Sequence, residues 1–351
     1  MKDWLERVQI LYSHLLDDDS KFIFKNRLLY SITCDYKYIR DIVLQTEMGK
    51  QVFQMLRQAE ERGKGIVLDG AGVYGEYIFQ DYPSIKWSCI CDAQKVKKRI
   101  FADTPVLERK NAVKKYCDAI FVISSIKYFD AIEEDLLALG VNKHNIINIG
   151  RKMHEIEKKM YFDVPNILPK EKNFFIDCGA YHGESTREFI NWCRGTDYQV
   201  IAFEPDRESY IQYKKNVEPL EKITVINAAA FDRKGKEYFN NTGTKSASID
   251  KNGDVEIETL TIDEIAGDAD ITFIKMDVEG VEMKALGGAQ NLIKRCSPVL
   301  AISLYHNPED IVDVMDFCLR LNSDYYFTLK HYTLGKAETV AFVVEVDKLN
   351  R

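Results

Sequence analysis

The chain has 351 residues, a length that suits two domains better than one. Hydrophobic residues make up 46% of it and charged residues 29%, which is the composition of an ordinary globular protein. Its formal net charge of −7 at pH 7 argues against a nucleic acid or an anionic membrane surface as the main partner. A membrane-spanning helix needs about 20 apolar residues in a row. We find no such run and expect no membrane span.

The cysteines and the first residues indicate the cellular compartment. The chain has 8 cysteines, which are scattered and form no C-x-x-C pair. This pattern favours reduced, structural thiols over a zinc site. The opening sequence is interrupted by charged residues and lacks the pattern of a signal peptide. We therefore expect a cytoplasmic protein.

The first part of the chain, residues 1–62, has the residue spacing of helices. Leu5, Val8, Leu11 and Leu15 recur on one helical face. A second stretch further along repeats this spacing. The sequence therefore predicts a helical N-terminal segment.

Residues 63–160 alternate between strand and helix patterns. The run "GIVLDGAGVYGEYIF" predicts a strand, a glycine turn and a helix, and "WSCICDA", "CDAIFVISS" and "NIINIG" predict further strands. Such alternation is typical of a parallel, doubly wound sheet. A charged stretch with prolines follows, which marks a domain boundary. We predict a Rossmann-like, nucleotide-type domain over these residues.

The alternation restarts within residues 161–351. Strands are predicted at "NFFIDC", "QVIAF", "ITVIN", "ITFIKM" and "PVLAIS", and each is followed by polar residues. The last two runs, "YYFTLKHYT" and "ETVAFVVEV", have a short connection and predict a terminal antiparallel hairpin. The loops "DGAGVYGE" and "DCGAYHGE" resemble each other. The predicted fold class is therefore α/β, with two doubly wound Rossmann-like domains in tandem behind the helical segment.

The upstream glycine loop has the spacing of a dinucleotide site. Gly70, Gly72 and Gly75 match G-x-G-x-x-G, and Asp92 follows at a distance suited to ribose hydroxyls. A loop of this kind offers backbone N–H groups to a pyrophosphate. Asp69 argues against that ligand, because its carboxylate would repel the phosphates. A scaffold domain that binds nothing tightly is the other interpretation.

The downstream loop suits S-adenosylmethionine, which has an ammonium and a sulfonium but no phosphate. Asp177 ends a predicted strand and can accept a hydrogen bond from the ammonium, while Gly179 and Gly183 let the backbone approach the methionyl part. Glu204, in "FEPD", ends the next strand and can hold both ribose hydroxyls. The pair of strand-end acids is more specific than the glycine loop alone.

Residues from about 172 to 345 resemble the FkbM family of S-adenosylmethionine-dependent methyltransferases. The segments that carry the resemblance occur in the family's order, and they are "FIDCGAYHGEST", "VIAFEPDRESYIQYKKNV", "ITVINAAAFD", "ETLTIDEI", "IKMDVEGVEMKALGGA" and "SLYHNPEDI". The resemblance implies a class I methyltransferase fold and O-methylation of a hydroxyl, often on a sugar or glycan-like acceptor. Tyr181 departs from the family, since many members carry Asn there. The upstream domain lies outside the resemblance.

Candidate cofactor-binding residues gather at the predicted strand ends and in the loops beyond them. They are Asp177, Gly179, Ala180, Gly183, Thr186, Glu204, Asn227, Ala228 and Asp277.

Methyl transfer to a hydroxyl benefits from a nearby base. His306, which follows the strand "AISLY", is the preferred candidate, and a helix-capping role is its alternative. Asp277 and Glu279 are the next catalytic candidates, with Lys275 expected to pair with Asp277. These two acids and His306 could also hold Mg²⁺, but the sequence has no dedicated metal spacing, so no metal site is predicted.

Two other functions stay open at this point. An NAD-dependent oxidoreductase would use the upstream loop, although the downstream chain has no Tyr-x-x-x-Lys arrangement. A non-catalytic binding or assembly protein is the other. The polar stretch 241–254, with Ser246 and Ser248, is either a loop over the acceptor or a solvated hairpin tip. We expect a small-molecule or glycan acceptor as the partner, and the chain could also form a homodimer.

Overall fold

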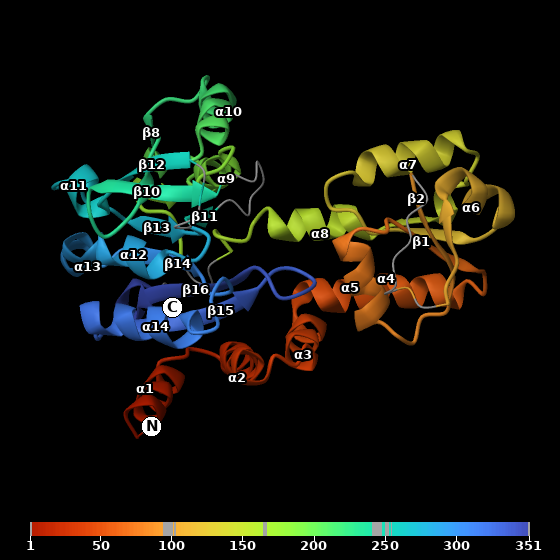
Figure 1. The fold of residues 1–351 in the computed structure, drawn as a ribbon, viewed down its shortest axis with the longest axis horizontal. Helices are drawn as coiled ribbons and strands as arrows, with labels where there is room; N and C mark the ends of the chain where they lie inside the picture. Colours follow the sequence, from red (N-terminus) through yellow and green to blue (C-terminus); the bar gives the residue numbers. More distant parts are fainter. Residues whose placement is uncertain are drawn as a thin grey trace. The chain divides into compact units, whose positions relative to one another are not determined.

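The computed structural model describes residues 2–93, 101, 103–163, 167–240, 248–249, 253 and 255–349. The chain divides into two compact units. Unit 1 contains Met1–Cys34, Lys158–Lys330 and Glu338–Arg351, and unit 2 contains Asp35–Glu157 and His331–Ala337. Each unit has its own sheet, which Figure 1 shows with its helices.

Unit 2 is built on a five-stranded sheet of order β3-β2-β1-β4-β5. All of its strand pairs are parallel. The elements are α3 (Lys37–Gln45), α4 (Glu47–Glu61), β1 (Ile66–Asp69), α5 (Val73–Asp81), β2 (Trp87–Asp92), β3 (Val106–Glu108), α6 (Arg109–Lys115), β4 (Ile120–Ile123), α7 (Phe129–Ala138), the 3₁₀ turn Lys143–Asn145, β5 (Ile146–Asn148) and α8 (Ile149–Glu157).

The central strands of unit 2 are apolar because both of their faces are covered. Every residue of β1 and β4 is buried, as expected for inner strands of a parallel sheet. Val67, Cys89 and Phe121 form one core with Leu136 of α7. The predicted alternation of strand and helix is confirmed here. The short strand β3 was not predicted.

Unit 1 is built on a seven-stranded sheet of order β15-β16-β14-β13-β6-β7-β8. The pairs from β14 to β8 are parallel, while β16 is antiparallel to β14. Its first elements are α1 (Lys2–Ser13), α2 (Asp18–Thr33), β6 (Lys172–Cys178), α9 (Glu184–Trp192), β7 (Asp197–Phe203), α10 (Arg207–Val217) and β8 (Ile223–Ile226). The later ones are α11 (Ile262–Ala266), β13 (Phe273–Met276), α12 (Glu282–Gly287), α13 (Gln290–Cys296), β14 (Val299–Ser303), α14 (Asp310–Leu321), β15 (Tyr325–His331), β16 (Thr339–Glu345) and the 3₁₀ turn Val346–Lys348.

A second, four-stranded sheet of order β11-β10-β12-β9 also belongs to unit 1. Its strands are β9 (Ala229–Ala230), β10 (Gly235–Asn240), β11 (Ser248–Ile249) and β12 (Val255–Leu260). Strand β12 pairs antiparallel with β10 and parallel with β9. Sequence reasoning did not resolve this sheet. The predicted loop at residues 241–254 falls largely outside the described residues, as does Ser246, and the side chain of Ser248 is not described.

Aromatic side chains fill one face of the large sheet in unit 1. Phe175 of β6 stacks on Phe189 of α9, with 4.5 Å between ring centroids. Phe162 lies against both of them and against Phe273 of β13. Large buried rings contribute heavily to a core because each one removes much apolar area from water. This cluster therefore anchors β6, β13 and α9, the elements that carry the candidate cofactor loop.

The N-terminal segment is helical as predicted, although Leu5 of the predicted apolar face is exposed. Helices α1 to α4 occupy most of residues 2–61, which confirms the prediction that this segment is helical. Helix α1 joins unit 1 through Arg7, which bonds Asp313 of α14 at 2.6 Å. Just beyond α1, Leu15 forms a parallel bridge with Phe327 of β15.

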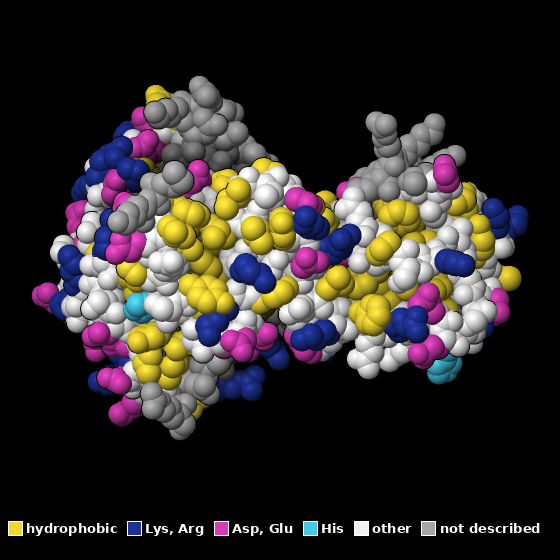
Figure 2. Space-filling model, turned by 90° about the horizontal axis from the view of Figure 1, so that it is seen from below, with side chains coloured by type: hydrophobic (Ala, Val, Ile, Leu, Met, Phe, Trp, Pro, Cys, Tyr) yellow, Lys and Arg dark blue, Asp and Glu magenta, His cyan; other side chains and the backbone are white. Residues whose placement is uncertain are grey.

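On the face shown in Figure 2, charges of both signs are mixed with patches of hydrophobic side chains. Trp4, Leu5 and Ile10 of α1 are among the exposed apolar residues. Among the described residues, no helix combines the length and the apolar character needed to cross a bilayer.

Candidate active site

The candidate site lies at one edge of the large sheet in unit 1. Strands β8, β7, β6, β13 and β14 are mutually parallel neighbours, so their carboxyl ends lie along the same edge. Ligands of open α/β sheets bind beyond this edge. The residues at or just past these ends are Asn227, Glu204, Asp177, Asp277 and His306. The topology therefore brings together the main predicted site residues of this half.

Asp177 is fully buried at the end of β6. Its Oδ2 accepts hydrogen bonds from Ser185 Oγ at 2.6 Å and from Thr186 Oγ1 at 2.9 Å, both in α9. Its Oδ1 lies 3.3 Å from Lys275 Nζ and accepts no hydrogen bond within the described part of the chain. The carboxylate thus ties the glycine loop to the first turn of α9.

Lys275 pairs with Asp177, whereas the sequence reasoning expected Asp277 as its partner. The reason is register, because Lys275 on β13 lies directly opposite Asp177 on β6. Neighbouring parallel strands bring such opposed residues together, while residues two apart on one strand are separated by about 7 Å. Lys275 Nζ also donates to the carbonyl oxygens of Cys178 at 3.1 Å and Gly179 at 2.5 Å. A buried ammonium therefore holds the backbone of the glycine loop.

The glycine loop needs its glycine at position 179. Gly179 has φ +77°, and a Cβ there would lie 1.9 Å from the carbonyl oxygen of Asp277. Only glycine fits both the left-handed conformation and this close approach. Ala180, which is buried, donates its N–H to the carbonyl of Phe203 at 3.1 Å. Gly183 is the N-cap residue of α9.

Glu204 links the loop that follows β6 to the loop that follows β7. Its Oε2 accepts from the N–H of Tyr181 at 2.7 Å, and its Oε1 accepts from the N–H of Asp206 at 2.9 Å. Burial raises the pKa of Glu204 to about 7, although these two hydrogen bonds act to lower it. Asn227 Nδ2 donates to the carbonyls of Glu204 and Pro205. The predicted ribose acid and the predicted adenine-edge residue are therefore neighbours.

Tyr181 and Ala228, two further positions from the sequence analysis, lie in the loops after β6 and β8. Tyr181, the departure from the family, has φ +47°. Asn and Gly tolerate this left-handed region better than tyrosine does. Ala228, beside Asn227, is buried.

Asp277 follows β13 at the centre of a partly buried hydrogen-bond network. Tyr161 OH donates to its Oδ2 at 2.8 Å, and Tyr305 OH donates to its Oδ1 at 3.1 Å. Burial by itself would raise the pKa of Asp277, but the charges of Lys275 and His306 and the hydrogen bond from Tyr161 hold it below its ordinary value. Sequence reasoning missed Tyr161, which precedes the domain's first strand and gave no periodic signal.

His306 lies among three carboxylates. Its Nε2 is 3.4 Å from Glu279 Oε2 and 3.6 Å from Asp277 Oδ1, and its Nδ1 is 2.9 Å from Glu282 Oε1. Burial alone would lower the pKa of His306, but these acids outweigh it and raise the pKa to about 11. We call Asp277, Glu279, Glu282 and His306 the acid–imidazole cluster. Glu282 was not predicted, because only the fold brings α12 beneath His306.

The helix-capping alternative for His306 finds no support in the geometry. Helix α14 begins at Asp310, with Glu309 as its N-cap residue. Asp310 closes this turn by accepting from the N–H of Asn307 at 2.8 Å. In the described structure, both ring nitrogens of His306 instead face the acids of the cluster.

The glycines of the upstream loop in unit 2 differ in how closely they are packed. A Cβ on Gly75 would lie 1.9 Å from the carbonyl oxygen of Gly70, so helix α5 packs directly on the loop. Gly72 is the N-cap residue of α5 and has open space where a Cβ would be. Asp92, at the end of β2, accepts from the N–H of Ala71 at 2.8 Å. Glu204 and Tyr181 form the matching contact in unit 1.

Asp69, whose charge we expected to oppose a pyrophosphate, is paired with an arginine. The Arg109 guanidinium donates to Asp69 Oδ2 at 2.7 Å and to Oδ1 at 3.0 Å, and Asp69 is fully buried. Arg109 also bonds Asp135 at 2.9 Å. A two-point contact of this kind neutralises most of the carboxylate's field. The expected repulsion is therefore largely removed.

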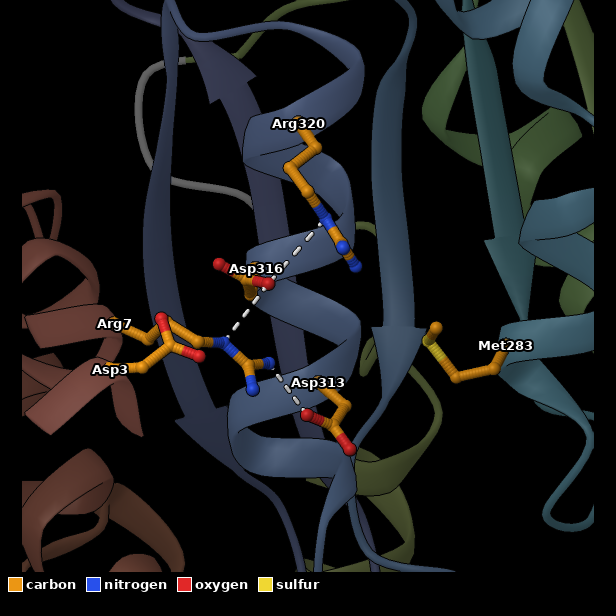
Figure 3. Close-up of a pocket in the computed structure, with 6 residues that line it drawn as sticks. All are labelled: Asp3, Arg7, Met283, Asp313, Asp316 and Arg320. Atoms are coloured by element: carbon orange, nitrogen blue, oxygen red, sulfur yellow. Dashed lines mark hydrogen bonds and ion pairs between the residues drawn. The ribbon is translucent and has the colours of Figure 1, made fainter. Parts of the chain in front are cut away.

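A separate hollow of about 540 Å³ lies between α1, α12 and α14 in unit 1 (Figure 3). Arg7 pairs with Asp313 and with Asp316, which in turn lies 3.5 Å from Arg320 Nε. None of the predicted site residues lines this hollow. Since Arg7, Asp313, Asp316 and Arg320 pair with one another, we interpret the hollow as an ion-pair ladder between α1 and α14.

Comparison with known proteins agrees with this geometry. Residues 177–325 match the family model described as the methyltransferase FkbM domain. The 2-O-methyltransferase NoeI of Sinorhizobium fredii (strain NBRC 101917 / NGR234) is 24% identical over 161 residues, which cover 39% of this chain and 65% of that protein. The chain thus spans less than two thirds of that relative.

Solved structures with similarity include two methyltransferases. The methyltransferase FkbM from Methylobacillus flagellatus KT has 18% identity and a TM-score of 0.48, and the match covers 85% of this chain and 99% of that one. An rRNA methylase from Streptococcus thermophilus has 12% identity and a TM-score of 0.35, with coverage of 56% and 95%.

The sheet edge and the matched family model define a class. Residues 177–325 form an FkbM-type domain of the S-adenosylmethionine-dependent methyltransferases, which confirms the resemblance found in the sequence.

Proposed function

We propose that the protein is an S-adenosylmethionine-dependent O-methyltransferase that methylates a hydroxyl of a sugar or glycan-like acceptor. The observation that carries this proposal is one sheet edge with a cofactor-type pair of acids, Asp177 and Glu204, beside the acid–imidazole cluster. The edge belongs to an FkbM-type domain. The relative described as a 2-O-methyltransferase supports a hydroxyl acceptor.

In this proposal the cofactor lies across the ends of β6 and β7. Glu204 accepts hydrogen bonds from the ribose hydroxyls, and Asn227 with Ala228 borders the adenine. Gly179, Ala180 and Gly183 leave room for the methionyl part, while Asp177 Oδ1 can accept from its ammonium. Thr186 supports the loop by donating to Asp177 Oδ2.

The acceptor then lies past β13 and β14, and the cofactor supplies the methyl group. The protein must hold the acceptor oxygen in line with the carbon–sulfur bond and take up the hydroxyl proton. We assign these tasks to Asp277, Glu279 and His306. His306 serves as a base only in its neutral form, and the three surrounding carboxylates favour its protonated form.

We also propose that the chain contains two Rossmann-like domains in tandem. The five-stranded parallel sheet of unit 2 and the seven-stranded sheet of unit 1 support two Rossmann-like domains in tandem, the second with a class I methyltransferase fold. Strands β15 and β16, which are neighbours, would form the terminal antiparallel hairpin. The division into residues 1–62, 63–160 and 161–351 stays a prediction, as do the cytoplasmic location, the homodimer and the lack of a nucleic-acid partner.

For the upstream loop we propose a nucleotide with its ribose at Asp92 and its phosphates at the start of α5. Open space at Gly72 and the neutralised Asp69 support this. An oxidoreductase that uses NAD through Gly70, Gly72 and Gly75 is the competing interpretation, and it predicts binding of NADH.

Thermal melting with added ligands separates these functions. S-adenosylhomocysteine should raise the melting temperature under the proposal, because a ligand that binds only the folded state stabilises it. The variant Glu204→Ala should abolish the shift. Asp177→Ala is a poor test, since it would leave Lys275 buried without its ion partner. A shift with NADH and none with S-adenosylhomocysteine would contradict the proposal, and calorimetry provides an independent check.

A further inference from the structure

The acid–imidazole cluster holds more negative than positive charge. Glu279 and Asp277 face Nε2 of His306, and Glu282 faces Nδ1. Lys275, the nearby ammonium, is already shared by Asp177 and two backbone carbonyls. Buried carboxylates are stable only when paired with cations or well hydrogen-bonded.

Two members of the cluster, His306 and Glu282, are buried and incompletely satisfied, whereas Asp277 and Glu279 are partly exposed. The side chain of His306 is 10% exposed and that of Glu282 is 0% exposed. Neither ring nitrogen of His306 makes a hydrogen bond within the described residues, although carboxylate oxygens lie near both, and Glu282 Oε2 has none either. An imidazole surrounded by carboxylates is a donor set that a divalent cation can use.

The distances fit a metal ion. Ligand atoms about 2.1 Å from one ion lie about 3.0 Å apart in an octahedral arrangement and about 3.4 Å apart in a tetrahedral one. From His306 Nε2, the oxygens of Glu279 and Asp277 lie at 3.4 and 3.6 Å. A second observation concerns a different trio, since Asp277, Glu282 and His306, without Glu279, each bring one candidate ligand atom within 4.8 Å of the others.

We infer that the acid–imidazole cluster binds a divalent cation through His306 Nε2 and the carboxylates of Asp277 and Glu279. Glu282, on the opposite ring nitrogen, acts as the positioning residue that fixes the imidazole, since metal-bound histidines usually contact a carboxylate through their second nitrogen. One imidazole with two carboxylates suits a transition-metal ion such as Mn²⁺. When bound, the cation lowers the pKa of an acceptor hydroxyl, and His306 then serves as a ligand of the cation instead of as the base. The catalytic role of this cation site rests on the proposed methyltransferase function.

The test is a calorimetric titration of the full-length protein with MnCl₂, with and without S-adenosylhomocysteine. We expect one Mn²⁺ per chain. Glu279→Gln and His306→Gln should each weaken binding by more than about tenfold, and Glu282→Gln by about 10–100-fold. Glu309→Gln is the matched control, because this exposed acid lies three residues from His306 and should leave Mn²⁺ binding unchanged. Electron paramagnetic resonance of the bound Mn²⁺ gives a second readout.

The outcomes separate the two proposals. If the wild-type protein binds S-adenosylhomocysteine but not Mn²⁺, the cation site is wrong and the methyltransferase proposal stands. If Mn²⁺ binds equally well to Glu279→Gln and His306→Gln, it binds elsewhere and the inference is again overturned. Glu279 is 28% exposed, so its variant should fold. Retained binding of S-adenosylhomocysteine by each variant confirms that it did.

Discussion

Glu204 links the charge state of one side chain to cofactor binding. Its pKa of about 7 means that the carboxyl gains a proton as the pH falls below neutrality. A protonated carboxyl has less capacity to accept hydrogen bonds from ribose hydroxyls. We therefore expect the affinity for S-adenosylhomocysteine to fall by up to about tenfold between pH 8 and pH 6. Calorimetry at a series of pH values measures this.

A matched pair of variants identifies the titrating group. Glu204→Gln should bind the ligand weakly at every pH, and Glu208→Gln, an exposed acid at the start of α10, should keep the wild-type pH dependence. An affinity in the wild-type protein that stays constant over this range would contradict the assignment.

Lys275 and Asp177 form a buried pair whose members depend on each other. Lys275→Met leaves the Asp177 carboxylate buried without its cation, which should cost about 3–5 kcal/mol of unfolding free energy. The double variant Asp177→Asn with Lys275→Met removes both charges and should regain most of that loss. Chemical denaturation of the variants gives the coupling energy. A double variant as unstable as Lys275→Met would show that the two residues are not coupled.

The residues that sequence reasoning found are those that carry a local signal. Asp177 and Glu204 end apolar runs, so their place at the sheet edge follows from the pattern alone. The partner of Lys275 depends on the register between β13 and β6, which no local pattern encodes. Tyr161 and Glu282 enter the site through long-range packing and were missed for the same reason.

At the scale of elements, helix α5 depends on contact with its own glycine loop. Gly75→Ala would place a Cβ 1.9 Å from the carbonyl oxygen of Gly70, which should destabilise unit 2 by about 1–3 kcal/mol. Gly72→Ala meets open space and should cost less than about 1 kcal/mol as an N-cap change. Denaturation curves compare them. Equal losses would contradict the packing argument.

The elements that could be predicted are the long, strongly patterned ones. The strands β1, β4, β6 and β13 are apolar runs bounded by turn residues, and the structure confirms them. Strand β3 and the four-stranded sheet as a whole were not predicted, although the hairpin-tip interpretation of residues 241–254 implied flanking strands, which are β10 and β12. Strand β3 and the strands of this sheet are short, or their buried residues are separated by exposed polar ones, as in β12 (Val255–Leu260). Tertiary pairing rather than a local sequence pattern therefore defines them.

At the scale of the whole molecule, each unit has its own sheet and its own buried core. We therefore expect two unfolding transitions in differential scanning calorimetry. S-adenosylhomocysteine should raise only the transition temperature of unit 1. At a hundredfold excess over its dissociation constant it should add about 2.7 kcal/mol to that unit's free energy of unfolding. Gly75→Ala should lower only the other one. A single transition that responds to both changes would rule out independent units.

The position of β16 in the large sheet has a consequence for how the protein is made. Strand β16 (Thr339–Glu345) lies between β14 and β15 and pairs with β14, yet it follows both of them in the chain. While the ribosome is still translating this segment, β14 has a bare edge and β15 has no link to the sheet. Unpaired edges recruit other strands. A nascent chain that stalls before Thr339 is therefore the form of this protein most prone to aggregate.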